Sequence, residues 1–337
     1  MNRSIFKQQF DTRLESFLTE KIQERDLLLY DTTLQALFAY IQPFSHEGKR
    51  IRPYNLYLRY HACGGTDSAM AFDLSLSLEL IQLFALIHDD IVDQGTLRHG
   101  IATYHRYLHT LYPSEAVATG QAMLMGDVVY TRAVEHFTQN ELPADVKKQL
   151  RLLLKEVLVG EILDVHMSHT AIVTDPSLIP IKDKLKSGYY TFKRPMLLGA
   201  TLAQADPSTC NAIEALGEDL GLAFQMRDDL LDIIDPKANK TPFSDHQEWN
   251  QTSLFLYALH HCTTKEKQYL LDTRWKPLDT DTIVMLRTIF ETSGAIQHSK
   301  DEINALLAGC TRQLTTLFPE KNDYVDEIEN IIAFLNV

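Results

Sequence analysis

Two short acidic runs in this sequence have the residue types and spacing to hold divalent cations. Both read DDxxD, at residues 89–93 and again at residues 228–232. On a helix, residues i and i+4 lie one turn apart on the same face, so the first and last carboxylates of each run point together. Such carboxylates repel one another unless cations compensate them, and carboxylate oxygens suit Mg²⁺ or Ca²⁺. The alternative is that each acidic run is a solvated helix end. The presence of two such runs on two apolar helices disfavours this alternative.

Mg²⁺ usually takes only one or two protein carboxylates and completes its coordination with water and substrate phosphates. The runs lack the glycine turn of a twelve-residue calcium loop. Two such runs facing one another would hold several Mg²⁺ ions and one diphosphate.

Cations accompany the acidic runs. Residues 48–53 include three of them, Arg98 follows the first run, Lys186 begins another predicted helix, and Lys240 follows the second run. Arginine grips phosphate oxygens with a planar fork, and lysine acts as a point charge. Each cation taken singly is equally consistent with a solvated surface charge. Together with the aspartates, they predict two diphosphates bound differently, one through metal ions and one through side-chain cations.

Helices are the elements that must position these residues. Glycine (14) and proline (12) are sparse in 337 residues, and apolar residues recur at helical spacing, as in Leu150–Leu163 and Ala212–Leu231. Phe72–Leu80 alternates like a strand but runs directly into the apolar stretch Leu80–Asp93. Because a strand of about 20 residues would be exceptional, one buried helix is predicted. No linker, repeat or low-complexity tract is present, so we expect an all-α protein with a single domain over residues 1–337.

Composition narrows the function classes. The formal net charge of −13 disfavours binding to nucleic acid or to an anionic membrane surface. The four cysteines are widely spaced and form neither a zinc pattern nor a disulfide framework. The charged, polar start is unlike a signal peptide, and no window offers the ~20 uninterrupted apolar residues of a membrane span. We expect a cytoplasmic protein that is not integral to a membrane.

An ordered series of motifs resembles the trans-prenyl diphosphate synthases, the farnesyl and geranylgeranyl diphosphate synthase family. The series comprises GKRIRP at 48–53, ELIQLFALIHDDIVD at 79–93, LRHG at 97–100, LMGDVVYTRA at 124–133, GEILD at 160–164, KSGYYTF at 186–192, GLAFQMRDDLLD at 221–232 and SGAI at 293–296. The resemblance implies an isoprenoid synthase-type helical bundle around a central active-site cavity, and a homodimer.

The resemblance also implies roles for individual residues. Mg²⁺, three ions per active site, would be held by Asp89, Asp90, Asp93, Asp228 and Asp232, with Asp229 as nearby support. Isopentenyl diphosphate would be held by Lys49, Arg52, Gln82 and His99, and the allylic diphosphate by Arg98, Lys186, Ser187 and Lys240. Gln225 would line the reacting centre and contact substrate there. The groups implied to act directly in catalysis are Asp89, Asp90, Asp93, Lys186, Gln225 and Asp228.

The implied reaction joins isopentenyl diphosphate to dimethylallyl, geranyl or farnesyl diphosphate by ionisation, condensation and elimination. Phe84 and Ala85 stand five and four positions before Asp89, where the family's product tunnel has its floor. A phenylalanine there implies a C20 product, geranylgeranyl diphosphate, with C15 farnesyl diphosphate as the alternative. Plain core packing of Phe84 is the other interpretation.

Three departures from the family pattern are visible. His99 stands where a second arginine is usual, Asn250 where a lysine of a GKxT segment is usual, and Glu161 replaces the glutamine of a GQxxD motif that ends at Asp164. These losses leave a weakly active or regulatory subunit of a heteromeric synthase as one alternative. A terpene cyclase is the other, although Lys49, Arg52 and the second aspartate run oppose it.

Overall fold

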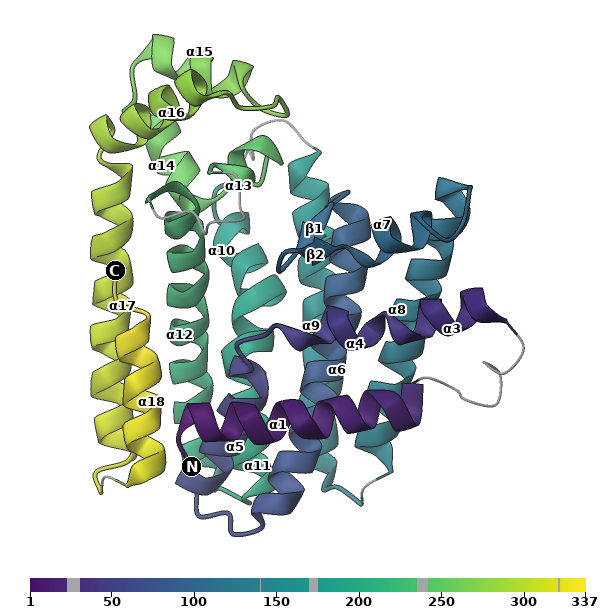
Figure 1. The fold of residues 1–337 in the computed structure, drawn as a ribbon. Coiled ribbons are helices and arrows are strands. Elements are labelled where there is room, and N and C mark those ends of the chain that lie inside the picture. Colours follow the sequence, from purple (N-terminus) through teal and green to yellow (C-terminus); the bar gives the residue numbers. More distant parts are fainter. Residues whose placement is uncertain (23–30, 140, 170–174, 235–241, 321) are drawn as a thin grey trace. The chain divides into compact units, whose positions relative to one another are not determined.

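Helices make up most of the described chain (Figure 1). The computed structural model describes residues 1–22, 31–139, 141–169, 175–234, 242–320 and 322–337. Among these, one short hairpin is the sole β-structure, and the all-α class predicted from the sequence is confirmed. The four cysteines are free, as their spacing predicted.

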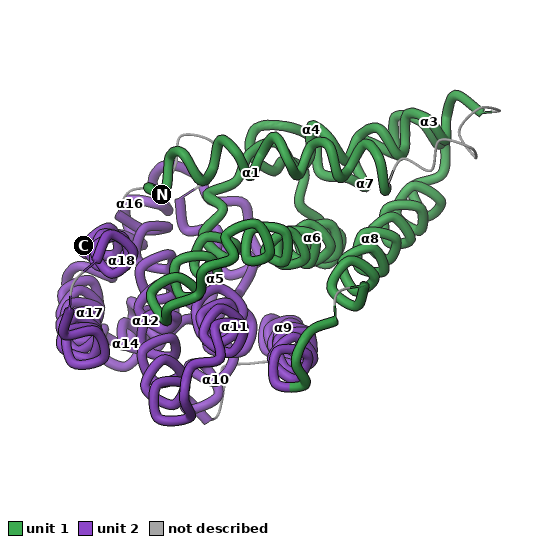
Figure 2. The backbone as a smooth tube through the Cα atoms, turned by 90° about the horizontal axis from the view of Figure 1, so that it is seen from below, with its two compact units in different colours: residues 1–144 green, residues 145–337 purple. Residues whose placement is uncertain are grey.

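The chain divides into two compact units, residues 1–144 and 145–337 (Figure 2). The single domain expected over residues 1–337 stays a prediction. The first unit contains α1 (Arg3–Phe17), the π-helix η1 (Leu18–Ile22), α3 (Thr32–Ala39), α4 (Ile41–His46), α5 (Ile51–Ala62), α6 (Ser68–Val92), β1 (Leu97–Arg98), β2 (Ile101–Ala102), α7 (Tyr104–His109) and α8 (Glu115–Thr138).

The second unit is helical throughout its described residues. It contains α9 (Ala144–Ser168), whose first residue falls in the first unit, α10 (Leu178–Asp183), the π-helix η2 (Lys184–Lys193), α11 (Arg194–Leu202), α12 (Pro207–Ile234), α13 (Ser244–Gln247), α14 (Ser253–His261), α15 (Thr264–Asp272), α16 (Thr280–Thr292), α17 (Ala295–Leu317) and α18 (Asp323–Phe334).

Helix α6 is the central element of the first unit and carries the first aspartate run at its end. It packs against α5 and α8. The side chain of Asp67 caps its start by accepting a hydrogen bond from the Met70 amide. The strand-like stretch Phe72–Leu80 lies inside this helix, as predicted.

Of the described helices, α6 is the one long and apolar enough to cross a membrane by length and composition. However, 67% of its apolar window is buried inside the fold, which is the property of a core helix.

Arg50 ties the start of α5 to the rest of the first unit. Its backbone is left-handed (φ 50°), and its buried guanidinium donates hydrogen bonds to Asp11 (2.6 Å), Glu79 (2.5 Å) and the Ser45 carbonyl oxygen (2.6 Å). These partners lie on α1, α6 and α4. A buried arginine is tolerated where its donors are satisfied in this way. Of the three cations in residues 48–53, Arg50 is therefore structural.

Helix α12 organises the second unit, where it packs against η2, α11 and α17. Glycines allow the closest approach. A Cβ atom on Gly221 would lie 2.5 Å from the Cα of Gly188, and one on Gly160 would lie 2.2 Å from the amide nitrogen of Lys186. The backbone of η2 is therefore held directly against α12 and α9.

The expectation that Lys186 begins a helix is wrong. The residue lies inside η2, which follows α10 and leads into α11 without a break. π-Helical turns are rare overall, and those that occur are often found at functional sites.

We expect Gly221→Ala to destabilise the protein by roughly 1–3 kcal/mol or more, because the new methyl group meets backbone that cannot move aside. Gly120→Ala is the matched control, since a Cβ there meets nothing within 4 Å and alanine favours a helix interior. Thermal unfolding of both variants tests this. Equal thermal midpoints for the two variants would show that η2 and α12 can move apart to accommodate the methyl group without loss of stability.

Candidate active site

The first aspartate run lies where α6 ends and the β-hairpin begins. Asp89 and Asp90 belong to the last turn of α6, and the amide of Asp93 donates to the Asp89 carbonyl oxygen (2.9 Å). Arg98, on β1, reaches back to the run. Its Nε donates to Asp90 Oδ1 (2.8 Å), and its Nη2 lies 2.6 Å from the same oxygen and 3.1 Å from Asp89 Oδ2. The structure thus brings Asp89, Asp90 and Arg98 together.

Asp90 is the buried member of this run, with 3% of its surface exposed. Burial raises the pKa of its carboxyl group, and Arg98 opposes that rise. Its Oδ2 atom is buried and has no hydrogen-bond partner among the described residues. A buried carboxylate oxygen without a protein donor suits a cation.

The residues fit Mg²⁺ that is bound jointly by protein and substrate better than a metal ion coordinated by protein side chains alone. Among the described residues, no three His, Cys, Asp or Glu side chains gather closely enough to hold a metal ion. Mg²⁺ needs only one or two carboxylates when phosphate oxygens and water supply the rest. The arrangement therefore suits Mg²⁺ together with a phosphate ligand.

The hairpin that presents Arg98 has a two-residue turn, His99 and Gly100. Both residues have positive φ angles, 52° and 84°, as in the type I′ turn that matches the twist of the flanking strands. His99 is exposed at this turn. Its role in holding isopentenyl diphosphate stays a prediction.

The second aspartate run lies near the end of α12. Asp228 is exposed, whereas Asp229 and Asp232 are buried. Gln225 donates from Nε2 to Asp229 Oδ1 (2.7 Å). Burial, together with Asp183 and Asp245, raises the pKa of Asp229 well above its usual range.

Asp232 is held by the start of α13. The Ser244 hydroxyl donates to its Oδ1 (2.7 Å), and the Asp245 amide donates to its Oδ2 (3.2 Å). Each carboxylate oxygen has a second lone pair, so Asp232 retains the capacity to bind a cation.

Lys186, on η2, reaches two acidic residues of α9. Its Nζ is 2.6 Å from Asp164 Oδ2 and 3.3 Å from Glu161 Oε1. Burial would raise the pKa of Asp164, but Lys182 and Lys186 outweigh it and lower the pKa below its usual value. Glu161, which replaces the family's glutamine, thus shares Lys186 with Asp164.

Lys182 was missed by the sequence analysis. Its buried ammonium contacts Asp164 Oδ1 (3.3 Å), Asp183 Oδ1 (3.2 Å) and Asn250 Oδ1 (2.7 Å). The available signal was its position four residues before Lys186, which places two lysines about one helical turn apart.

The other predicted residues lie on several elements. Lys49 is exposed before α5, Arg52 is half-buried in the first turn of α5, and Ser187 is half-buried on η2. Gln82, on α6, has a buried Oε1 atom with no hydrogen-bond partner among the described residues. Lys240 lies outside the described residues.

Phe84 and Ala85 precede the first run on α6. Phe84 is buried, and its ring centroid lies 5.0 Å from that of Tyr130 on α8 and 4.7 Å from that of His88. Ala85 is half-buried. Phe84 therefore belongs to an aromatic cluster one turn and more before Asp89.

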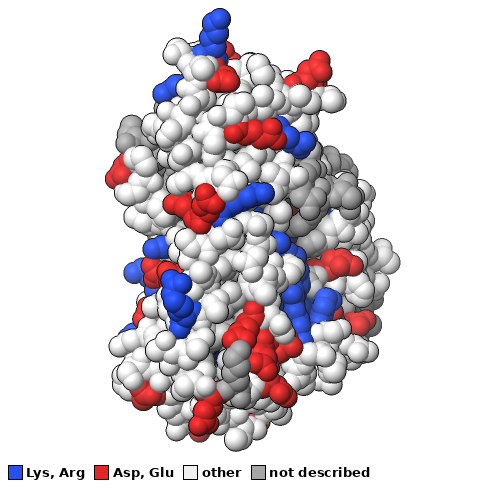
Figure 3. Space-filling model, turned by 90° about the vertical axis from the view of Figure 1, so that its left-hand side faces the viewer, with Lys and Arg blue, Asp and Glu red and all other residues white. Residues whose placement is uncertain are grey.

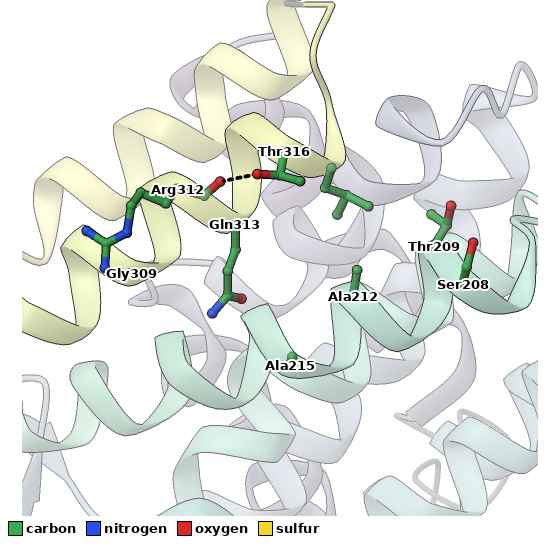
Figure 4. A pocket seen from close by; sticks show the side chains of 9 residues that line it. Ser208, Thr209, Ala212, Ala215, Gly309, Arg312, Gln313 and Thr316 are labelled. Atoms are coloured by element: carbon green, nitrogen blue, oxygen red, sulfur yellow. Dashed lines mark hydrogen bonds between the residues drawn. The ribbon is translucent and has the colours of Figure 1, made fainter.

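One cavity of the second unit lies away from the aspartates. It has a volume of about 620 Å³ and lies between the first half of α12, including Ala212, and α17, including Arg312 (Figure 4). Ala212 and Asp228 are about 24 Å apart along α12 at roughly 1.5 Å per residue. A narrow cavity does adjoin the second run. Its lining includes Asp229, Asp232, Asp245 and Asn250, together with other polar and apolar residues. Basic and acidic side chains are interspersed on the face in Figure 3.

Comparison with known proteins gives a consistent result. The model of the polyprenyl synthetase family matches residues 31–285. A geranylfarnesyl diphosphate synthase of Natronomonas pharaonis is 28% identical over 309 residues, which cover 86% of this chain and 85% of that protein. A geranylgeranyl diphosphate synthase of Methanosarcina mazei is 30% identical over 265 residues, which cover 75% of each chain.

The fold is similar to that of solved structures in the same family. A geranylgeranyl pyrophosphate synthase from Corynebacterium glutamicum, complexed with isoprenyl diphosphate and magnesium, aligns with a TM-score of 0.86 at 25% identity. The alignment covers 97% of this chain and 98% of that one. The family match spans most of the sequence and includes both aspartate runs, so this protein belongs to the polyprenyl synthetase family of prenyltransferases.

Proposed function

We propose that this protein is a Mg²⁺-dependent, cytoplasmic prenyl diphosphate synthase that joins isopentenyl diphosphate to allylic diphosphates and acts as a homodimer. One observation carries the proposal. Two long apolar helices each end in a DDxxD run, and each run contains a buried aspartate whose pKa burial raises. Such groups are costly in a fold unless they bind cations or polyanions in concert with cations.

The proposed Mg²⁺ ligands are Asp89, Asp90, Asp93, Asp228 and Asp232, with three ions per active site. Bound Mg²⁺ neutralises the charge that builds on a departing diphosphate. Arg98 and Lys186 are the described cations beside these runs that we assign to the allylic diphosphate, joined by Lys240. Arg98 contacts the aspartates through Nε and Nη2, so its remaining N–H groups suit phosphate oxygens.

The chemistry needs no side-chain nucleophile. The allylic C–O bond ionises, and the double bond of isopentenyl diphosphate then attacks C1 of the allylic cation. The released diphosphate accepts the proton that restores the double bond. Apolar residues of α6, such as Leu80, Leu83 and Ile87, are buried, and such walls keep water from the cation. Gln225, half-buried one turn before Asp229, lines the reacting centre in this proposal.

The proposed product is C20 geranylgeranyl diphosphate. Phe84 supports this: its ring is buried and packs on Tyr130 and His88, and a ring at this place would block extension along α6. Relatives include synthases named for geranylgeranyl and for geranylfarnesyl products. C15 and C25 products are therefore the alternatives that product analysis distinguishes.

The first test is product formation from labelled isopentenyl diphosphate with dimethylallyl, geranyl and farnesyl diphosphate. We expect Mg²⁺-dependent chains ending at C20, and loss of activity with EDTA that added Mg²⁺ reverses. Asp228→Asn should lower kcat/KM at least about a hundredfold, as loss of one charge-stabilising group does, without unfolding the protein because Asp228 is exposed. Asp301→Asn, at an exposed position on α17, is the control. No condensation by the folded protein would point to a partner-dependent subunit instead.

Phe84→Ala should lengthen the product distribution beyond C20, since it opens space on α6 more than one turn before Asp89. The lost ring also costs roughly 3–5 kcal/mol of stability. Phe137→Ala, which removes another buried ring from the first unit, controls for that cost. Chromatography of the dephosphorylated products is the measurement. An unchanged distribution would leave Phe84 as core packing only.

His99→Arg should lower KM for isopentenyl diphosphate several-fold with little change in kcat, because it adds a permanent charge with a planar fork. His109→Arg, at an exposed histidine at the end of α7, is the control for added charge. Steady-state kinetics with each substrate varied in turn separates the two. A change confined to the allylic substrate would place His99 at the other diphosphate.

A further inference from the structure

Lys182 is a buried cation beside the second aspartate run that none of the family motifs includes. Its side chain is 3% exposed. The ammonium nitrogen lies 2.7 Å from Asn250 Oδ1, 3.2 Å from Asp183 Oδ1 and 3.3 Å from Asp164 Oδ1. The contact with Asn250 is a hydrogen bond, and the two contacts with aspartates are ion pairs. Lysines are almost never buried to this extent unless they are paired, so these contacts define its position.

A chain of hydrogen bonds runs from Lys182 to Asp232. Asn250 accepts from Lys182 through Oδ1 and donates from Nδ2 to Asp245 Oδ1 (3.3 Å). Its backbone amide donates to the Asp245 carbonyl oxygen (2.7 Å). The Asp245 amide in turn donates to Asp232 Oδ2 (3.2 Å). Asn250, Asp245 and Asp232 line the same narrow cavity.

The buried carboxylates around this chain of hydrogen bonds require a cation to compensate them. Asp183, Asp229 and Asp232 are all buried. Burial lowers the pKa of Lys182, but the carboxylates of Asp183, Asp164 and Asp229 outweigh burial and raise it above the ordinary value. Lys186 is already engaged by Glu161 and Asp164. Lys182 is therefore the cation that reaches Asp183 and Asn250.

Asn250 is also the position where the family resemblance led us to expect a lysine. The structure places an ammonium group at this position from another segment, since Lys182 on α10 donates directly to the Asn250 side chain. Separation of the two residues in the sequence concealed this pairing.

We propose that Lys182 is a positioning residue for the second aspartate run. Its ammonium holds Asn250, and through Asn250 and Asp245 it holds the carboxylate of Asp232. It also supplies the positive charge that position 250 lacks. The inference rests on the proposed function, because Asp232 must act there as part of a site for Mg²⁺ and diphosphate.

The test measures the affinity for inorganic diphosphate by calorimetry, with and without Mg²⁺. Asn250→Ala cuts the link to Asp245 but leaves Lys182 paired with two aspartates, so this variant should fold. We expect its Mg²⁺-dependent affinity to fall about 10–100-fold, as it does when a group that orients a metal ligand is lost. Lys182→Met should show the same loss together with a lower thermal midpoint, because it leaves buried carboxylates uncompensated.

A charge exchange supplies the decisive variant. Lys182→Met combined with Asn250→Lys returns one ammonium to the same place from the other segment, and it should recover most of the affinity and of kcat. Lys184→Met is the matched control. It removes a lysine two residues away that pairs with Glu218 (2.7 Å) outside this chain of bonds, and its diphosphate affinity should match that of the wild type.

The outcomes separate this inference from the proposed function. Two results would overturn the positioning role of Lys182 and leave the proposed function standing. One is a wild-type diphosphate affinity in Asn250→Ala. The other is a folded exchange variant that binds diphosphate as weakly as Lys182→Met. A wild-type protein that binds Mg²⁺ and diphosphate but condenses no prenyl substrate overturns the proposed function and leaves the positioning role intact. A wild-type protein that binds no diphosphate with Mg²⁺ overturns both. If Lys182→Met fails to fold, the Asn250→Ala result decides.

Discussion

The constraint on which the rest of this structure depends is the compensation of carboxylates at the ends of two apolar helices. Asp90 in one unit, and Asp229 and Asp232 in the other, are buried where ionised carboxyl groups are costly. Each needs a cation, a hydrogen-bond donor or a proton. The elements around them, including the hairpin after α6 and the π-helix beside α12, are explained by the need to bring such partners close.

The two units meet this constraint by different means. In the first, one arginine on a tight hairpin contacts two aspartates of the same run. In the second, two lysines from adjoining segments share Asp164, and amide and hydroxyl groups satisfy Asp229 and Asp232. A guanidinium fork suits a pair of carboxylates on one helix, whereas ammonium groups suit acceptors from several directions. The acidic run in each unit is thus held in its own way.

The sequence was sufficient for the helical class, for both long helices and for the family, because these depend on periodicity and on motifs contiguous in the chain. Three features were not predictable in that way. Arg50 looked like a ligand-binding cation, but its partners on three other helices make it structural. The π-helix around Lys186 depends on close packing against Gly160 and Gly221. The proposed role of Lys182 depends on its contact with Asn250, which lies far along the sequence. All three depend on contacts between distant segments, which periodicity does not encode.

The contact between Gly188 and Gly221 has a consequence for how such a protein can change over time. There the lysine-bearing segment and the aspartate-bearing helix meet through main chain, so no single substitution adjusts their spacing gradually. Phe84, by contrast, is proposed to limit product length with a side chain that one codon change can enlarge or shorten. The parts proposed to handle diphosphate are thereby constrained by backbone packing, while the proposed limit on product length depends on a replaceable side chain. Divergence in this protein's lineage should accordingly alter what is made before it alters how it is made.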